Sequence, residues 1–301
     1  MLRTYNEIYL AARNVLRSYN IEGYALEAKV LVAAAAGKST SRLLRDMHLF
    51  TSPEVEAKVV EYLERRVKGE PVAYITGTWE FYGLPMKVTR DVLIPRMDTE
   101  LLVDTAKEVL LGKMMDAKIL DLCCGSGCIS CAIAHEFPAT KIIAADISNN
   151  ALQICRDNVM ANRLNSRVFC LQTDATAPPP LSMNGFDMII SNPPYIPTAE
   201  ILTLDKSVKD YEHMWALDGG EDGLKFYRTI IAYWTRALRP GGYLLLEVGE
   251  GQAKEVCSMM MKAGYMNVRT KQDTLKTDRV VYGKLSTVTG KKDRKEDSTD
   301  G

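Results

Sequence analysis

Apolar side chains recur three and four positions apart through the first 70 residues, which is the spacing of helices with one buried face. The segment that opens with Thr51-Ser52-Pro53-Glu54 has the residue types that favour a helix start. The two expected buried stripes comprise Tyr5, Ile8, Ala12, Val15 and Tyr19, and then Val55, Val59, Leu63 and Val67. Because no strand pattern interrupts them, the sequence predicts a small helical bundle.

A connector follows the bundle. Residues 78 to 89, TWEFYGLPMKVT, contain two β-prone runs about Gly83-Leu84-Pro85 and predict a hairpin. Asp98 and Thr99 can then cap a helix that runs to about Leu111. The hairpin therefore joins the helical bundle to the rest of the chain.

From residue 117 onward, short apolar strands alternate with amphipathic helices. The expected strands are AKILDL, TKIIAADI, RVFCLQTD, GFDMIISN and GGYLLLEVG. One long helix, GLKFYRTIIAYWTRAL, is expected to bury Leu224, Tyr227, Ile231, Trp234 and Leu238. This alternation predicts an α/β fold, a mostly parallel sheet with helices on both faces, whose ligands bind at the carboxyl ends of the strands. The predicted domains are 1–72, 73–97, 98–285 and a flexible tail, 286–301.

Composition adds few constraints. The apolar fraction of 47% and the charged fraction of 25% are typical of a globular protein. Lys plus Arg and Asp plus Glu both number 38, so nothing predicts broad electrostatic binding to nucleic acid. The N-terminus lacks a signal-peptide pattern and no apolar run is long enough to span a membrane. We therefore expect a soluble, cytoplasmic protein, and a monomer.

Four of the seven cysteines, Cys123, Cys124, Cys128 and Cys131, fall within nine residues. Thiols so close together on a tight turn cannot all form disulfides of good geometry, so we expect reduced cysteines. Zinc binding is the alternative, because some of these spacings suit zinc ligands. No second ligand cluster follows, and the three histidines do not pair at a metal-ligand spacing. We expect no metal.

A glycine-rich turn, Cys123-Cys124-Gly125-Ser126-Gly127, separates the first expected strand of the sheet from a helix near Cys128. Such a turn lets a ligand approach the backbone and its amide hydrogens. The third glycine of a dinucleotide fingerprint is absent. Three acids, Asp121, Asp146 and Asp174, end successive strands, and Asp146 suits a ribose diol. The pattern favours a nucleoside without a pyrophosphate, and S-adenosylmethionine fits, since its sulfonium is cationic.

The fourth strand leads into SNPPYIP, residues 191 to 197. An amide or exocyclic amino nitrogen is a weak nucleophile, because its lone pair is delocalised. The side-chain oxygen of Asn192 and the carbonyl of Pro193 can accept the two hydrogens of such an NH2 group, and Tyr195 can stack on its plane. These hydrogen bonds strengthen as the nitrogen becomes positive, which favours the transition state. The alternative is a plain strand stop with Tyr195 as core filler.

The motifs together resemble a known family. GEPVAYITGTWEFYG, LIPRMDTE, DLCCGSGCISCAIA, SNPPYIP and ALDGGEDGLKFYR, in this order, are similar to the HemK/PrmC family of release-factor glutamine methyltransferases. The resemblance extends from Met1 to about Lys284. It implies a Rossmann-like methyltransferase sheet, S-adenosyl-L-methionine as cofactor with S-adenosyl-L-homocysteine as product, and peptide chain release factors as protein substrates. The methylated glutamine would lie in their Gly-Gly-Gln loop.

The resemblance also implies roles for individual positions. The N-terminal helical domain would help to recognise the release factor. The family places the cofactor against Asp121, Cys123, Cys124, Gly125, Ser126, Gly127, Asp146, Asp174, Ala175 and Asn192. It places the substrate glutamine against Asn192, Pro193, Pro194 and Tyr195. Independently of the family, we expect Arg96 as a further substrate contact.

Some positions depart from the family or allow two interpretations. Cys123 and Cys124 occupy the start of a loop that is often threonine-rich in relatives, and Ala175 is small where relatives carry a bulky residue. Arg96 either reaches the ligands or acts as a structural clamp. Glu212 and the ALDGGEDG segment either close over the site or form a loop that caps the next helix.

Two other functions are compatible with the motifs. A nucleic-acid amino-methyltransferase would use the same acceptor geometry on a flipped base. It would need a basic surface, yet residues 1 to 88 hold twelve Lys and Arg against ten Asp and Glu. A non-enzymatic module that docks on translation factors is the third hypothesis, and the intact Asp121, Asp146 and Asn192 argue against it.

Overall fold

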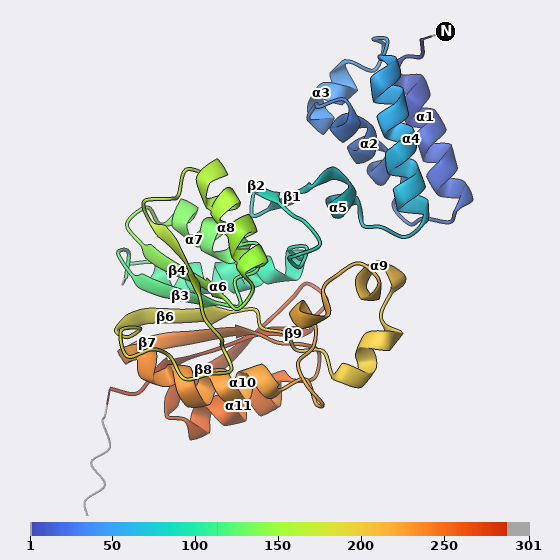
Figure 1. Cartoon of the computed structure of the whole chain (residues 1–301). Helices are drawn as coiled ribbons and strands as arrows, with labels where there is room; N and C mark the ends of the chain where they lie inside the picture. The colour runs from blue at the N-terminus through green and yellow to red at the C-terminus, as the bar shows by residue number, and fades with distance from the viewer. Residues whose placement is uncertain (1, 113, 288–301) are drawn as a thin grey trace, which may run out of the picture.

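The computed structural model describes residues 2–112 and 114–287, so all but the first two residues of the predicted tail lie outside it. Figure 1 shows a helical lobe, a connector and a larger lobe built on a twisted sheet. None of the helices in the described chain is both long and apolar enough to cross a membrane.

The helical lobe confirms the predicted bundle. Its helices are α1 (Tyr5–Ser18), α2 (Tyr24–Ala35), α3 (Thr40–Arg45), α4 (Pro53–Val67) and α5 (Val72–Thr76). Ser52 caps α4, and Pro53 occupies its first turn, as the sequence predicted. The first predicted stripe is wrong at one end: Val15 and Tyr19 are 37% and 60% exposed, and Leu16 is buried instead. Since α1 ends at Ser18, Tyr19 lies beyond the helix.

The connector is a short hairpin that packs on the sheet lobe. Strands β1 (Thr78–Phe81) and β2 (Leu84–Lys87) pair antiparallel, so the turn lies at Tyr82 and Gly83 rather than at Leu84 and Pro85. Both turn residues have positive φ. Beyond the hairpin, Val88, Val92 and Ile94 share an apolar cluster with residues of the sheet lobe.

The larger lobe contains a seven-stranded sheet of order β5-β4-β3-β6-β7-β9-β8. Its strands are β3 (Lys118–Leu122), β4 (Lys141–Asp146), β5 (Val168–Gln172), β6 (Phe186–Ser191), β7 (Leu238–Glu247), β8 (Tyr265–Gln272) and β9 (Asp278–Leu285). The first five in this order run parallel, and β9 and β8 add antiparallel pairs. The mostly parallel, Rossmann-like sheet is confirmed, although the pattern analysis did not identify β8 or β9.

Helices cover both faces of this sheet (Figure 1). On one face lie α6 (Glu100–Leu110), α7 (Cys128–Glu136) and α8 (Asn149–Ala161). On the other lie α10 (Lys225–Thr229), the helical turns η4 (Ile230–Trp234) and η5 (Thr235–Ala237), and α11 (Ala253–Lys262). Between β6 and α10 the chain forms η2 (Thr198–Thr203), α9 (Lys206–Lys209) and η3 (Met214–Ala216).

Two predicted helices differ in detail. The segment from residue 223 is α-helical only to Thr229, continues as a π-turn and a 3-10 turn, and gives Leu238 to β7. The helix expected after Asp98 is preceded by a 3-10 turn, η1 (Met97–Thr99). The Thr99 side chain makes no cap hydrogen bond to its helix. It turns instead toward the carboxyl edge of the sheet.

Candidate active site

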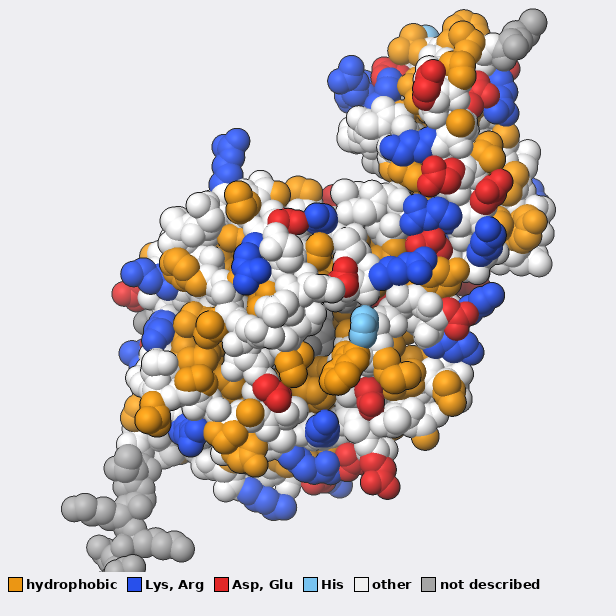
Figure 2. Space-filling view, viewed as in Figure 1, with side chains coloured by type: hydrophobic (Ala, Val, Ile, Leu, Met, Phe, Trp, Pro, Cys, Tyr) orange, Lys and Arg blue, Asp and Glu red, His pale blue; other side chains and the backbone are white. Residues whose placement is uncertain are grey.

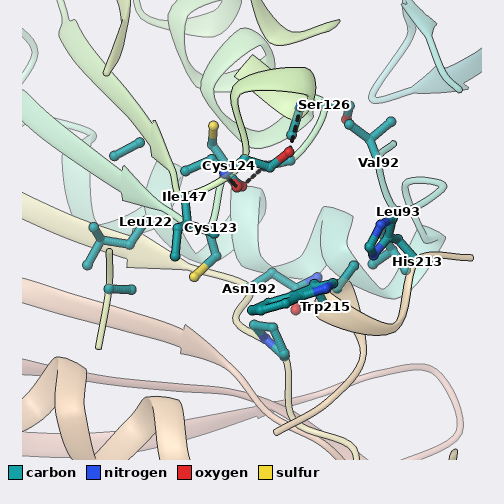
Figure 3. A pocket seen from close by; sticks show the side chains of 18 of the residues that line it. Val92, Leu93, Leu122, Cys123, Cys124, Ser126, Ile147, Asn192, His213 and Trp215 are labelled. Atoms are coloured by element: carbon teal, nitrogen blue, oxygen red, sulfur yellow. Dashed lines mark hydrogen bonds between the residues drawn. The ribbon is translucent and has the colours of Figure 1, made fainter. Parts of the chain in front are cut away.

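A cavity of about 850 Å³ opens at the carboxyl ends of the parallel strands (Figure 3). Its lining includes ten of the predicted site residues: Arg96, Cys123, Cys124, Gly125, Ser126, Asp146, Asp174, Ala175, Asn192 and Pro194. Asp121, Gly127, Pro193 and Tyr195 lie outside the lining. The fold thus brings most of the predicted residues together, from β3, β4, β5 and β6.

The loop between β3 and α7 has a conformation that few residues tolerate. Cys123, Gly125 and Gly127 all have positive φ. A Cβ built on Gly127 would lie 2.4 Å from Sγ of Cys155 on α8, whereas one built on Gly125 would meet nothing within 4 Å. Gly127 is therefore required both by its backbone conformation and by close packing.

Asp146 ends β4 and is held by backbone amides. Gly125 N donates to its Oδ2 and Ser148 N to its Oδ1, each at 2.9 Å. Burial raises the pKa of this carboxyl, while the amide hydrogen bonds lower it. The side chain connects the glycine loop to the β4 edge and lines the cavity beside Asp174 and Ala175.

Asp121 lies behind this edge rather than in it. It is fully buried within β3, and Ser130 Oγ donates to its Oδ2 at 2.6 Å. Burial raises its pKa to about 7. Of the three strand-end acids singled out in the sequence, only Asp146 and Asp174 line the cavity.

Asn192 follows β6 and is oriented by Thr99. Its Nδ2 donates to Thr99 Oγ1 at 3.2 Å. Within residues 2–112 and 114–287, no hydrogen bond is made to Asn192 Oδ1. The acceptor oxygen of the amide is thus available at the cavity while its donor is engaged.

Behind this pair lies Glu247, at the end of β7. It is 2% exposed, and its Oε2 has no hydrogen-bond partner among the described residues. Burial raises the pKa of its carboxyl to about 7, and the neighbouring Thr99 and Asn192 side chains oppose that shift. The sequence pattern did not identify these two residues as part of the site, because it assigned Thr99 only to a helix cap and Glu247 only to a strand.

We expect Glu247 to make stability depend on pH. Between the ordinary value of 4.5 and about 7, the folded protein binds more protons at this site than the unfolded chain. The contribution to stability therefore falls as the pH rises through this window. The Glu247→Gln variant should therefore gain stability relative to the unchanged protein as the pH rises. The difference between their free energies of unfolding should grow by about 3 kcal/mol between pH 4.5 and 8. Urea unfolding at several pH values measures this difference; exposed Glu250→Gln is the control. A pH-independent difference would contradict the assignment.

The NPPY extension is held from outside the cavity. Ile196 N donates to Leu217 O at 3.0 Å, and Gly219 N donates to Ile196 O at 2.8 Å. Gln252 Nε2 donates to Tyr195 O at 2.8 Å. These contacts dock the ALDGGEDG segment against the extension, and no side chain larger than hydrogen fits at Gly219, where a Cβ would lie 2.7 Å from Tyr195 Cα.

Tyr195 itself packs away from the cavity. Its ring packs against the buried core on the face of the sheet that α10 and α11 cover, and a Cβ on Gly249 would lie 3.0 Å from its Cδ2. Burial raises its pKa to about 12. The structure therefore does not place this ring in the cavity beside Asn192.

Arg96 lies at the cavity and also forms an ion pair. It lines the cavity, and its Nη2 lies 2.5 Å from Oε1 of Glu212, whose side chain is 1% exposed. Burial raises the pKa of Glu212, and Arg96 opposes that shift. Asp222, by contrast, lies outside the lining and accepts from Leu224 N just before α10.

The clustered cysteines are all free thiols. Burial raises the pKa of Cys123 and of Cys128, so these thiols stay protonated at neutral pH. Across residues 2–112 and 114–287, His, Cys, Asp and Glu side chains form no group of three that could hold a metal ion.

Family models match both lobes. Residues 7–77 match the PrmC N-terminal domain, and residues 98–205 match the methyltransferase small domain. A protein of Geobacter sulfurreducens named "Release factor glutamine methyltransferase" is 40% identical over 91% of this chain and 94% of its own length. One of the same name from Caulobacter vibrioides is 38% identical, over 94% of this chain and 97% of its own length.

A solved structure shares the fold. The hMettl16 catalytic domain, solved in complex with an MAT2A 3'UTR hairpin, superposes with a TM-score of 0.56. The match covers 76% of this chain and 82% of that one, at 13% identity. At this identity the likeness concerns the fold alone.

Proposed function

The chain belongs to the release factor glutamine methyltransferase family, and from this premise we propose that it methylates the side-chain amide nitrogen of a glutamine in peptide chain release factors. The methyl donor would be S-adenosyl-L-methionine, and the glutamine would lie in a Gly-Gly-Gln loop. Both lobes support this, since close relatives of that name match nearly the whole chain. Translation termination is a cytoplasmic process, so we place the protein there.

The residues at the β3, β4 and β5 end of the cavity fit this cofactor. Two oxygens on Asp146 can accept hydrogen bonds from a ribose diol, and the amide of Gly125 fixes that carboxylate in place. Asp174 and Ala175 border the neighbouring wall, where the adenine would lie. When bound, the cofactor supplies a methyl group on a sulfonium that leaves as a neutral thioether.

Asn192 is the residue that carries the proposal. Its Oδ1, left free by the contact between Nδ2 and Thr99, can accept one hydrogen of the glutamine NH2. The carbonyl of Pro193 would accept the other. As the nitrogen becomes positive, both hydrogen bonds strengthen, so they stabilise the transition state more than the ground state. After transfer, the nitrogen can release a proton to water, so the cavity needs no dedicated base.

We expect the purified protein to transfer label from S-adenosylmethionine to a purified release factor. Replacing the glutamine of the Gly-Gly-Gln loop with alanine should abolish labelling, because no other side chain presents the same amide there. Scintillation counting after gel separation measures both reactions. Label that persists on the altered factor, or that appears only on DNA or RNA, would refute the proposed substrate.

A further inference from the structure

Tyr195, the aromatic residue of the motif, does not line the cavity, whereas other aromatic side chains do. Tyr195 is packed against Gly249 outside the lining, whereas Trp215 on η3 lines the cavity and is 75% exposed. Figure 3 shows the indole of Trp215 and the side chain of Asn192 among those that line the cavity. A tryptophan exposed at an enzyme cavity is a large apolar surface that no part of the described chain covers.

Trp215 belongs to the acceptor end of the cavity. Its segment is fixed on one side by the ion pair of Glu212 with Arg96. On the other side, hydrogen bonds of Leu217 and Gly219 with Ile196 join it to the extension of β6. Asn192 is the first residue of that extension. The groups suited to the cofactor instead follow β3, β4 and β5. Trp215 is thus anchored to the strand that carries the proposed NH2 acceptors.

The surface around it is also apolar. Met214, next in the chain, is 57% exposed and also lines the cavity. Figure 2 shows hydrophobic side chains gathered about the hollow on this face of the sheet lobe. Tryptophan and methionine are residue types that are enriched where proteins bind other proteins.

We propose that Trp215 is a substrate-binding residue whose indole face packs against the planar acceptor amide and the adjoining glycine peptide groups of the release factor. The inference rests on the proposed function and assigns the stacking role to Trp215 in place of Tyr195. Flat amide groups suit an aromatic face, and glycines bring no side chain that would hold them off. The indole then limits rotation of the glutamine NH2 group that faces the Asn192 oxygen.

Steady-state kinetics with a release factor test this assignment. Trp215→Ala should raise KM for the factor about tenfold, and Trp215→Phe should recover most of the loss because it keeps a flat ring. The Kd for S-adenosylmethionine, measured by calorimetry, should stay within about twofold. Trp79→Phe, on β1, and Leu202→Ala, which shortens an exposed side chain on η2, are controls with unchanged KM.

The outcomes separate the two proposals. Unchanged KM in Trp215→Ala, with normal methylation by the unaltered protein, would overturn the role of Trp215 and leave the proposed function standing. A Kd for the cofactor that rises in parallel with KM would also overturn it, because the indole would then belong to the cofactor end. If the unaltered protein methylates no release factor, the proposed function fails, and this inference fails with it.

Discussion

Asn192→Ala is expected to lower kcat by a factor on the order of 10² to 10³ while the Kd for S-adenosylmethionine changes little. The substitution removes the only side-chain oxygen proposed to accept a hydrogen from the glutamine NH2. Because that hydrogen bond strengthens as the nitrogen becomes positive, its loss acts on the transition state. The proposed cofactor contacts come chiefly from β3, β4 and β5 and remain. Rapid-quench methylation assays and calorimetry measure the two quantities separately.

Thr99→Val is the matched control for orientation. It keeps the shape of Thr99 but removes the acceptor of the 3.2 Å hydrogen bond from Asn192 Nδ2. The amide is then free to turn, so kcat should fall by less than in Asn192→Ala, by about tenfold. Equal activity of Asn192→Ala and the unchanged protein would refute the acceptor role. A loss of cofactor affinity as large as the loss in kcat would instead place Asn192 mainly in cofactor binding.

The sequence predicted those parts of the fold that local pattern determines. Apolar runs such as KILDL and DMIIS become the central strands, and Ser52 with Pro53 begins α4, because period and capping are short-range properties. The glycine turn at residues 125 to 127 was likewise evident, since positive φ favours glycine.

The rest of the site depends on contacts between distant segments. Thr99 meets Asn192 across 93 positions, and Arg96 meets Glu212 across 116. Trp215 lies in a segment of short helical turns, where neither strand nor helix periodicity indicates which side chains face a ligand. The motif gives the sequence neighbours of Tyr195 but not Gly249 and Gln252, which lie between β7 and α11 and contact it in the fold.

Gly127→Ala is expected to weaken S-adenosylmethionine binding by a factor on the order of 10² and to destabilise the fold. The φ of +76° costs an alanine about 1 to 2 kcal/mol. The contact of 2.4 Å with Cys155 Sγ adds overpacking, typically about 1 to 3 kcal/mol. Because Gly125 N holds Asp146, any displacement of the loop also shifts the carboxylate proposed to bind the ribose.

A second substitution distinguishes crowding from backbone strain. Gly127→Ala combined with Cys155→Ala removes the sulfur that the new methyl group meets, so it should recover part of the lost affinity and stability. Gly125→Ala, where φ is +52° but nothing lies within 4 Å, should show only the cost of the backbone conformation. Calorimetry and urea unfolding measure both properties. If Cys155→Ala brought no recovery, contact with α8 would not be what requires glycine at position 127, and backbone conformation alone would set the shape of the cofactor loop.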